Sequence, residues 1–343
     1  MATDQPFDMI DWEFAARVGT TLTGEGPRVT AADASAAVAE LRADAEKSTA
    51  YVRGFTGLEA PEDSAPVLVV DRAGWVRANV DTFATMIAPA IEAVMKDRTP
   101  PPAFAQAIGA KVTGVEVGGL LGYLSSKVLG QFDPFHGEAG RLLLVAPNIV
   151  SVERELSVDP TDFRLWVCLH EETHRVQFTS SPWLRDHLLA QVSSLASSMD
   201  VNSLVDRVTD LVKGGNRGSL VEAMTSPEQR EILDSVTGVM SLLEGHADVV
   251  MDGVGPTVIP TVAEIRRAFD QRRKGVGVLD RVVRRLLGLE AKMAQYRDGA
   301  GFVRHVIGRI GMADFNVVWS NPDTLPSKAE IHDPDAWVAR VHG

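Results

Sequence analysis

Residues 159–178 read DPTDFRLWVCLHEETHRVQF, and this stretch decides how the rest of the chain is interpreted. Asp159 is a favourable N-cap, Pro160 suits the first helical position, and Asp162 lies near the positive end of the helix dipole. These signals predict a helix that begins at Asp159 and runs to about Phe178.

Inside this predicted helix, His170, Glu171 and His174 form an H-E-x-x-H motif. Four residues are about one helical turn, so both imidazoles project from one face and can bind the same ion. Glu171 lies at the edge of that face, where it can reach a zinc-activated water without being a ligand itself. The motif therefore predicts His170 and His174 as zinc ligands and Glu171 as the catalytic general base.

A second helix with a clear start is predicted further along the chain. Ser226 is followed by Pro227, and Gln229 completes a capping box. We expect this helix to run to about Asp252, because two glycines and a proline follow that residue. The segment EGHAD, residues 244–248, lies well inside it.

A catalytic zinc usually has three protein ligands, so one more is expected. The extended motif with a further glycine and histidine is absent, because Gln177 and Ser180 stand at those positions. We expect Glu244 to be the third ligand and Asp248, one turn later, to accept the distal N–H of a ligating histidine. His246 is the alternative ligand, and residues two apart point about 200° apart on a helix, so Glu244 and His246 cannot easily share one ion.

The rest of the chain is predicted to be mainly helical with a small sheet. Helices are expected over residues 31–51 and 75–96, and short strands over 67–70 and 142–145. The second strand is expected to flank the active helix as an edge strand that holds extended substrate. The glycine-containing stretch 103–131 is predicted to be a buried core helix, because glycines allow another backbone to approach closely.

Composition and charge exclude several classes of protein. The 343 residues carry a net charge of -12, which argues against nucleic acid as a partner. Lys111, Glu116 and Lys127 interrupt the most apolar stretch, so no membrane span is expected. The single cysteine, Cys168, cannot form an internal disulfide, and the acidic first residues are unlike a signal peptide. We therefore expect a cytoplasmic protein.

The two motifs together resemble the gluzincin branch of zinc metallopeptidases. The whole chain is similar to an actinobacterial family of zincin-like hydrolases, some members of which are associated with biosynthesis of a deazaflavin coenzyme. The segments that carry this resemblance are GGLLGYLSSKVLGQFDPF, LHEETHRVQF, LLEGHADVVMDGVG and VVWSNPDTLPSKAEI. The resemblance implies a zincin fold and a bound zinc, and it suggests no particular substrate.

We therefore expect a mainly α (α+β), zincin-like fold in which two helical lobes surround a zinc cleft. The first lobe, residues 1–180, ends with the H-E-x-x-H helix, and the second, residues 181–343, supplies the third ligand. The expected activity is that of a zinc-dependent hydrolase, in the first place a metallopeptidase, with a peptide or amide substrate. The alternatives are a non-proteolytic zinc-binding or scaffold protein and an amide hydrolase acting on a small metabolite, and the oligomeric state stays open.

A zinc peptidase also needs a hydrogen-bond donor that stabilises the tetrahedral oxyanion. Tyr296, Arg297 and His305 lie downstream of the two motifs, and Tyr123 lies upstream. None of these four side chains has a spacing that singles it out, so the oxyanion donor is left unassigned.

Overall fold

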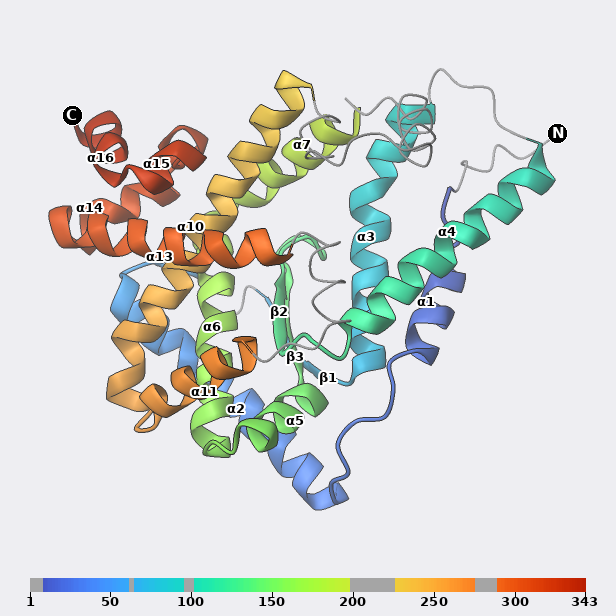
Figure 1. Cartoon of the computed structure of the whole chain (residues 1–343), viewed down its shortest axis with the longest axis horizontal. Coiled ribbons are helices and arrows are strands. Elements are labelled where there is room, and N and C mark those ends of the chain that lie inside the picture. Colours follow the sequence, from blue (N-terminus) through green and yellow to red (C-terminus); the bar gives the residue numbers. More distant parts are fainter. Residues whose placement is uncertain (1–8, 62–64, 96–101, 198–225, 275–288) are drawn as a thin grey trace.

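The computed structural model of the chain describes residues 9–61, 65–95, 102–197, 226–274 and 289–343. The described part is mostly helical with one small sheet, as the sequence predicts. Figure 1 shows the sheet in the middle of the molecule, with helices α1, α3 and α4 on one side and α6, α10 and α13 on the other.

All strands of the described residues lie in the N-terminal half of the chain, and the C-terminal half is helical. The N-terminal half contains α1 (Trp12–Thr21), α2 (Ala31–Thr56), β1 (Val67–Val70), α3 (Arg72–Met95), α4 (Ala103–Leu124), β2 (Gly130–Asp133), β3 (Arg141–Val145), α5 (Ala146–Leu156) and α6 (Pro160–Ser180). The C-terminal half contains α7 (Trp183–Ser197), α10 (Pro227–Val258), α11 (Val262–Lys274), α13 (Leu289–Ile310), α14 (Met312–Phe315), η1 (Asn316–Trp319), η2 (Pro322–Thr324), α15 (Lys328–His332) and α16 (Pro334–His342).

The sheet has three strands in the order β1-β3-β2. Strand β1 pairs with β3 in parallel, and β2 pairs with β3 antiparallel, so that Gly130 lies opposite Leu144. Every residue of β3 is buried. The predicted strand at 142–145 is therefore present but central, and the expectation that it forms an edge is wrong. The edge that faces α6 is β2, which the sequence analysis missed because GQFD lacks an alternating apolar pattern.

The two helices that carry the motifs start where their caps predict. The Asp159 carboxylate accepts a hydrogen bond from the Asp162 backbone N–H, and Ser226 forms a capping box with Gln229. Helix α10 ends at Val258 and includes Pro256, so it is longer than predicted. Its last turns bury apolar side chains such as Val254 against the core, and this packing outweighs the helix-breaking residues.

Helix α4 differs from its prediction, because it is not a core helix. Its glycines do allow close packing: a Cβ on Gly118 would lie 2.4 Å from the carbonyl oxygen of Ala15 in α1. The opposite face is exposed to solvent, with Phe104, Ile108 and Val112 all largely accessible. No helix within the described ranges combines the length and apolar character that crossing a bilayer requires.

The main apolar core contains residues from both sides of position 180, including Leu41 of α2, Leu169 of α6 and Leu243 of α10. Helix α6 packs against α2 and α10, and α10 packs against α13. Where α10 crosses α13, the backbones approach so closely that a Cβ on Gly245 would lie 2.2 Å from the carbonyl carbon of Gly299. These contacts fix α10 beside α6. The division into two lobes at residue 180 stays a prediction.

Candidate metal centre

The structure brings His170 and His174 of α6 together with Glu244 of α10. One potential ligand atom from each residue lies within 4.8 Å of the other two. The two imidazole Nε2 atoms are 3.3 Å apart, and Glu244 Oε2 lies 3.6 Å from His170 Nε2 and 3.7 Å from His174 Nε2. All three side chains are partly accessible to solvent.

This geometry fits a zinc ion. Tetrahedral zinc with metal–nitrogen bonds of about 2.0–2.1 Å places two nitrogen ligands about 3.4 Å apart. The observed 3.3 Å between the imidazole nitrogens of His170 and His174 matches that separation, and the Glu244 oxygen is only slightly farther away. Two histidines and one glutamate are also a ligand set that catalytic zinc sites use.

Glu171 lies beside the three ligands in a buried position against strand β2. A Cβ on Gly130 would lie 2.5 Å from Glu171 Cγ, so only glycine leaves room for this side chain. Burial raises the pKa of Glu171 to about 8, with a further rise from the charge of Glu244, while His174 and a backbone hydrogen bond from Phe132 oppose the shift. Perturbed carboxylic acids of this kind gather at catalytic sites.

The electrostatics of the ligand cluster favour a positive charge. Burial by itself lowers the pKa of His174, but a hydrogen bond with Glu244 and the charges of Glu244 and Glu171 outweigh burial and raise the pKa to about 9. The same carboxylates that favour a proton on His174 favour a divalent cation at the Nε2 atoms.

His246, the alternative ligand, does not join this cluster. Its side chain is fully buried, with ring centroids 5.8 Å from Phe315 and 5.2 Å from Trp319. Burial lowers its pKa to about 3, and the charge of His174 adds to that effect. The structure therefore places Glu244, and not His246, among the three converging ligand atoms.

Asp248 does not occupy the position expected for a partner of a ligating histidine. Its carboxylate oxygens bind Arg266 at 3.0 Å and Arg304 at 2.9 Å, and Arg304 also binds Asp252. The aspartate side chain is short and starts one helical turn beyond Glu244, where arginines of α11 and α13 are within reach. The expected role is corrected: Asp248 takes part in a surface ion-pair network.

Other side chains face the distal nitrogens of the two histidines. His174 Nδ1 lies 2.9 Å from Gln177 Oε1, and His170 Nδ1 lies 3.3 Å from Met251 Sδ. Neither Gln177 nor Met251 was found by sequence reasoning. Gln177 could have been, because it follows His174 by three residues and so shares its helix face.

The described residues give little support to the candidate hydrogen-bond donors for the tetrahedral oxyanion. The side chains of Tyr296 and Arg297 lie outside the described part of the structure. His305 is exposed and binds Asp335 at 2.8 Å, and Tyr123 packs beneath the ammonium group of Lys127. The donor for the oxyanion stays unassigned.

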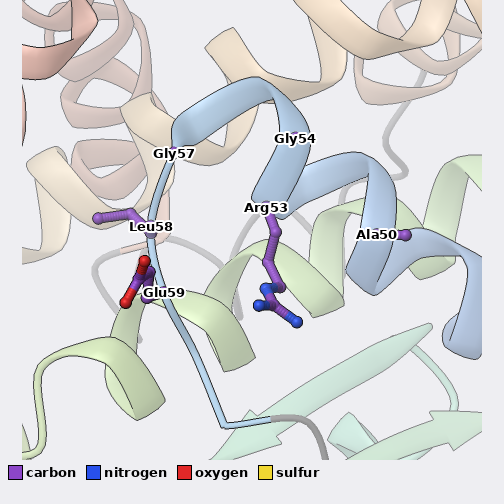
Figure 2. A pocket seen from close by; sticks show the side chains of 6 residues that line it. All are labelled: Ala50, Arg53, Gly54, Gly57, Leu58 and Glu59. Carbon is purple, nitrogen blue, oxygen red and sulfur yellow. The ribbon is translucent and has the colours of Figure 1, made fainter.

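A cavity of about 360 Å³ lies beside the C-terminal end of α2 (Figure 2). It is lined by Ala50, Arg53, Gly54, Gly57, Leu58 and Glu59. All of its lining residues come from one segment, and none is a predicted site residue. The cavity is therefore not part of the candidate metal centre.

Comparison with known proteins agrees with the geometry. The family model for zincin-like metallopeptidases matches residues 10–338. A crystal structure from Chloroflexus aurantiacus, provisionally described as a hydrolase with a novel fold, has 30% identity and a TM-score of 0.73, and covers 97% of this chain and 99% of its own. No curated protein matches. Because the family model spans nearly the whole chain, the protein belongs to the zincin-like metallopeptidase family.

Proposed function

We propose that the protein is a zinc-dependent hydrolase that cleaves peptide bonds. The observation that carries this proposal is the convergence of His170, His174 and Glu244 beside the buried carboxyl group of Glu171. A purely structural zinc site has no need of a general base, and structural sites are usually closed and rich in cysteine.

Each of these residues has a distinct task in the proposed reaction. His170, His174 and Glu244 hold the zinc ion, which when bound polarises the scissile carbonyl and makes a water molecule more acidic. Glu171 accepts the proton of the attacking water and delivers it to the leaving amine. Its burial against Gly130 keeps the carboxylate in one position beside the ligands.

A peptide substrate is supported by the position of strand β2. This strand lies at an edge of the sheet and packs against α6, the helix that carries His170, Glu171 and His174. The edge of a sheet can pair with an extended peptide through backbone hydrogen bonds, and Gly130 and Gln131 of β2 are partly accessible. A small amide would make no use of that edge.

The proposal is tested with Glu171→Gln and metal analysis. The wild-type protein and the variant should each contain about one zinc per chain, because Glu171 is not a ligand. Loss of the base should reduce turnover of a peptide library by about 100-fold or more. Full activity in Glu171→Gln would contradict the assigned mechanism.

The same assay separates the remaining functions. A protein that binds zinc but cleaves no peptide in the library would be a non-proteolytic zinc protein or a hydrolase of small amides. Cleavage of small amide substrates, again lost in Glu171→Gln, would identify the second of these.

A further inference from the structure

We propose that Gln177 is the residue that positions His174 for the metal, and that its side-chain amide also fixes the spacing between the two ligand-bearing helices. This inference rests on the metal site described under the proposed function. It assigns to a neutral amide the task that the sequence analysis gave to Asp248.

The side-chain amide of Gln177 has three polar contacts and is fully buried. Oε1 lies 2.9 Å from His174 Nδ1. Nε2 lies 2.9 Å from the Leu243 carbonyl oxygen and 2.9 Å from His246 Nδ1. The amide therefore contacts α6 on one side and α10 on the other.

These partners determine which way the amide points. A backbone carbonyl can only accept, so the NH₂ group of Gln177 must face Leu243. Its second hydrogen then goes to His246 Nδ1, which acts as the acceptor. The remaining oxygen faces His174 and must accept a hydrogen bond from the Nδ1–H. With its proton at Nδ1, His174 can present the Nε2 lone pair to a metal.

The contact with Leu243 has a second consequence. Leu243 immediately precedes Glu244, the third ligand, in α10. The hydrogen bond from Gln177 therefore holds the backbone of α10 at the turn that carries Glu244. One buried amide sets both the orientation of a ligand on α6 and the position of a ligand on α10.

The alternative is that Gln177 merely fills space between two helices. The two roles differ in what they demand of the side chain. An orienting role requires an acceptor facing His174 Nδ1, which glutamate keeps and methionine loses. A packing role requires only a similar volume, which methionine keeps.

The test compares Gln177→Met and Gln177→Glu with a matched control, Gln191→Met. Gln191 is a glutamine of α7 that likewise contacts α10, donating to Ser235 Oγ at 3.4 Å, but it is only partly buried and has no role at the proposed metal site. Zinc affinity is measured by competition with a chelator. We expect Gln177→Met to bind zinc about 10- to 100-fold more weakly and Gln191→Met to match the wild type. Gln177→Glu should recover only part of the loss, because it keeps the acceptor for His174 but lacks the donor to the Leu243 carbonyl.

A second readout does not depend on zinc. NMR spectra of metal-free protein with ¹⁵N-labelled histidine should contain a protected His174 Nδ1–H signal, assigned by its loss in His174→Ala. This proton is present whether or not Nε2 is protonated. It should persist in Gln177→Glu and exchange rapidly in Gln177→Met.

The outcomes separate this inference from the proposed function. A wild-type protein that binds no zinc overturns the proposed function and, with it, the metal-positioning role. A wild-type protein that binds zinc, together with unchanged affinity and an unchanged signal in Gln177→Met, overturns only the inference. Rapid exchange of the His174 Nδ1–H in Gln177→Glu as well as in Gln177→Met also overturns it, because the acceptor would then be irrelevant.

Discussion

At the scale of single residues, Glu244 and His246 are distinguished as third ligand by the direction in which each side chain leaves α10. The two side chains are separated by two positions on α10, so they leave the helix on nearly opposite faces. Glu244 faces the histidines of α6, whereas His246 is buried against Phe315 and Trp319.

This difference predicts the behaviour of two alanine variants. Glu244→Ala should lose bound zinc, because it removes one of three ligands. His246→Ala should keep about one zinc per chain but should lower the free energy of unfolding by about 2–4 kcal/mol, because it leaves a cavity in the core. Elemental analysis and urea unfolding measure the two effects. If His246→Ala lost zinc and Glu244→Ala kept it, His246 and not Glu244 would be the third ligand.

The candidate ligands could be predicted from sequence, because one helical turn fixes the relation between His170 and His174. Their outer partners were not predicted correctly. Asp248 has the chemistry that usually supports a ligating histidine, but the arginines that bind it come from α11 and α13, which no local pattern connects to α10. In the sequence pattern Gln177 only marks the absence of the glycine of the extended motif, although its partner His174 lies three residues away.

At the scale of elements, strand β2 and helix α6 together position the general base. Gly130 contributes no side chain, and the space this leaves is filled by Glu171. The contact is between an edge strand and the active helix, so a change on the strand should act on catalysis more than on folding.

We therefore expect Gly130→Ala to reduce turnover at least about 10-fold with an unchanged zinc content, because the new methyl group displaces Glu171. A suitable control is Gly119→Ala on α4, where a Cβ meets no atom within 4 Å. Peptide hydrolysis and elemental analysis of both variants provide the comparison. Wild-type turnover in Gly130→Ala would show that Glu171 needs no fixed position.

The elements themselves were predictable where caps and apolar runs were clear, as at Asp159 and Ser226. Two tertiary relations were not. A fully apolar strand has the same sequence pattern at the centre and at the edge of a sheet. Only its pairing with β1 and β2 shows that β3 is central. The apolar sequence of α4 predicts burial, but the helix packs only on the side that faces α1 and α3, and Phe104 and Ile108 are exposed.

At the scale of the whole molecule, the metal site joins parts of the chain that are far apart in sequence. A bound ion would crosslink α6 and α10, which already pack against each other in the core. An ion that binds only the folded chain stabilises it by mass action.

Zinc should therefore raise the thermal unfolding temperature of the metal-free protein. At free zinc of about 100 times Kd the gain is about 2.7 kcal/mol. Calorimetry with zinc or with a chelator measures the shift, and Glu244→Ala should show little of it. An equal zinc response in Glu244→Ala would mean that the ion binds elsewhere.

The C-terminal elements give a pH dependence that is independent of the metal. Burial raises the pKa of Glu330, but hydrogen bonds from Arg340 and Ser327 outweigh burial and lower it below 4.5. Arg340 Nε binds Glu330 at 2.6 Å, and its Nη2 donates to the Leu325 carbonyl, so this pair joins α15, α16 and the preceding turn.

A carboxyl group with a lowered pKa in the folded state stabilises the fold above its unfolded pKa, and this stabilisation is lost as the pH falls through the folded value. Glu330→Gln should therefore lower the free energy of unfolding by about 1–2 kcal/mol at pH 7 and by less near pH 3. Urea unfolding with a chelator present measures both values, with Glu13→Gln at the exposed end of α1 as control. An equal loss at both pH values would mean that the pair stabilises the C-terminal elements by packing and not by charge.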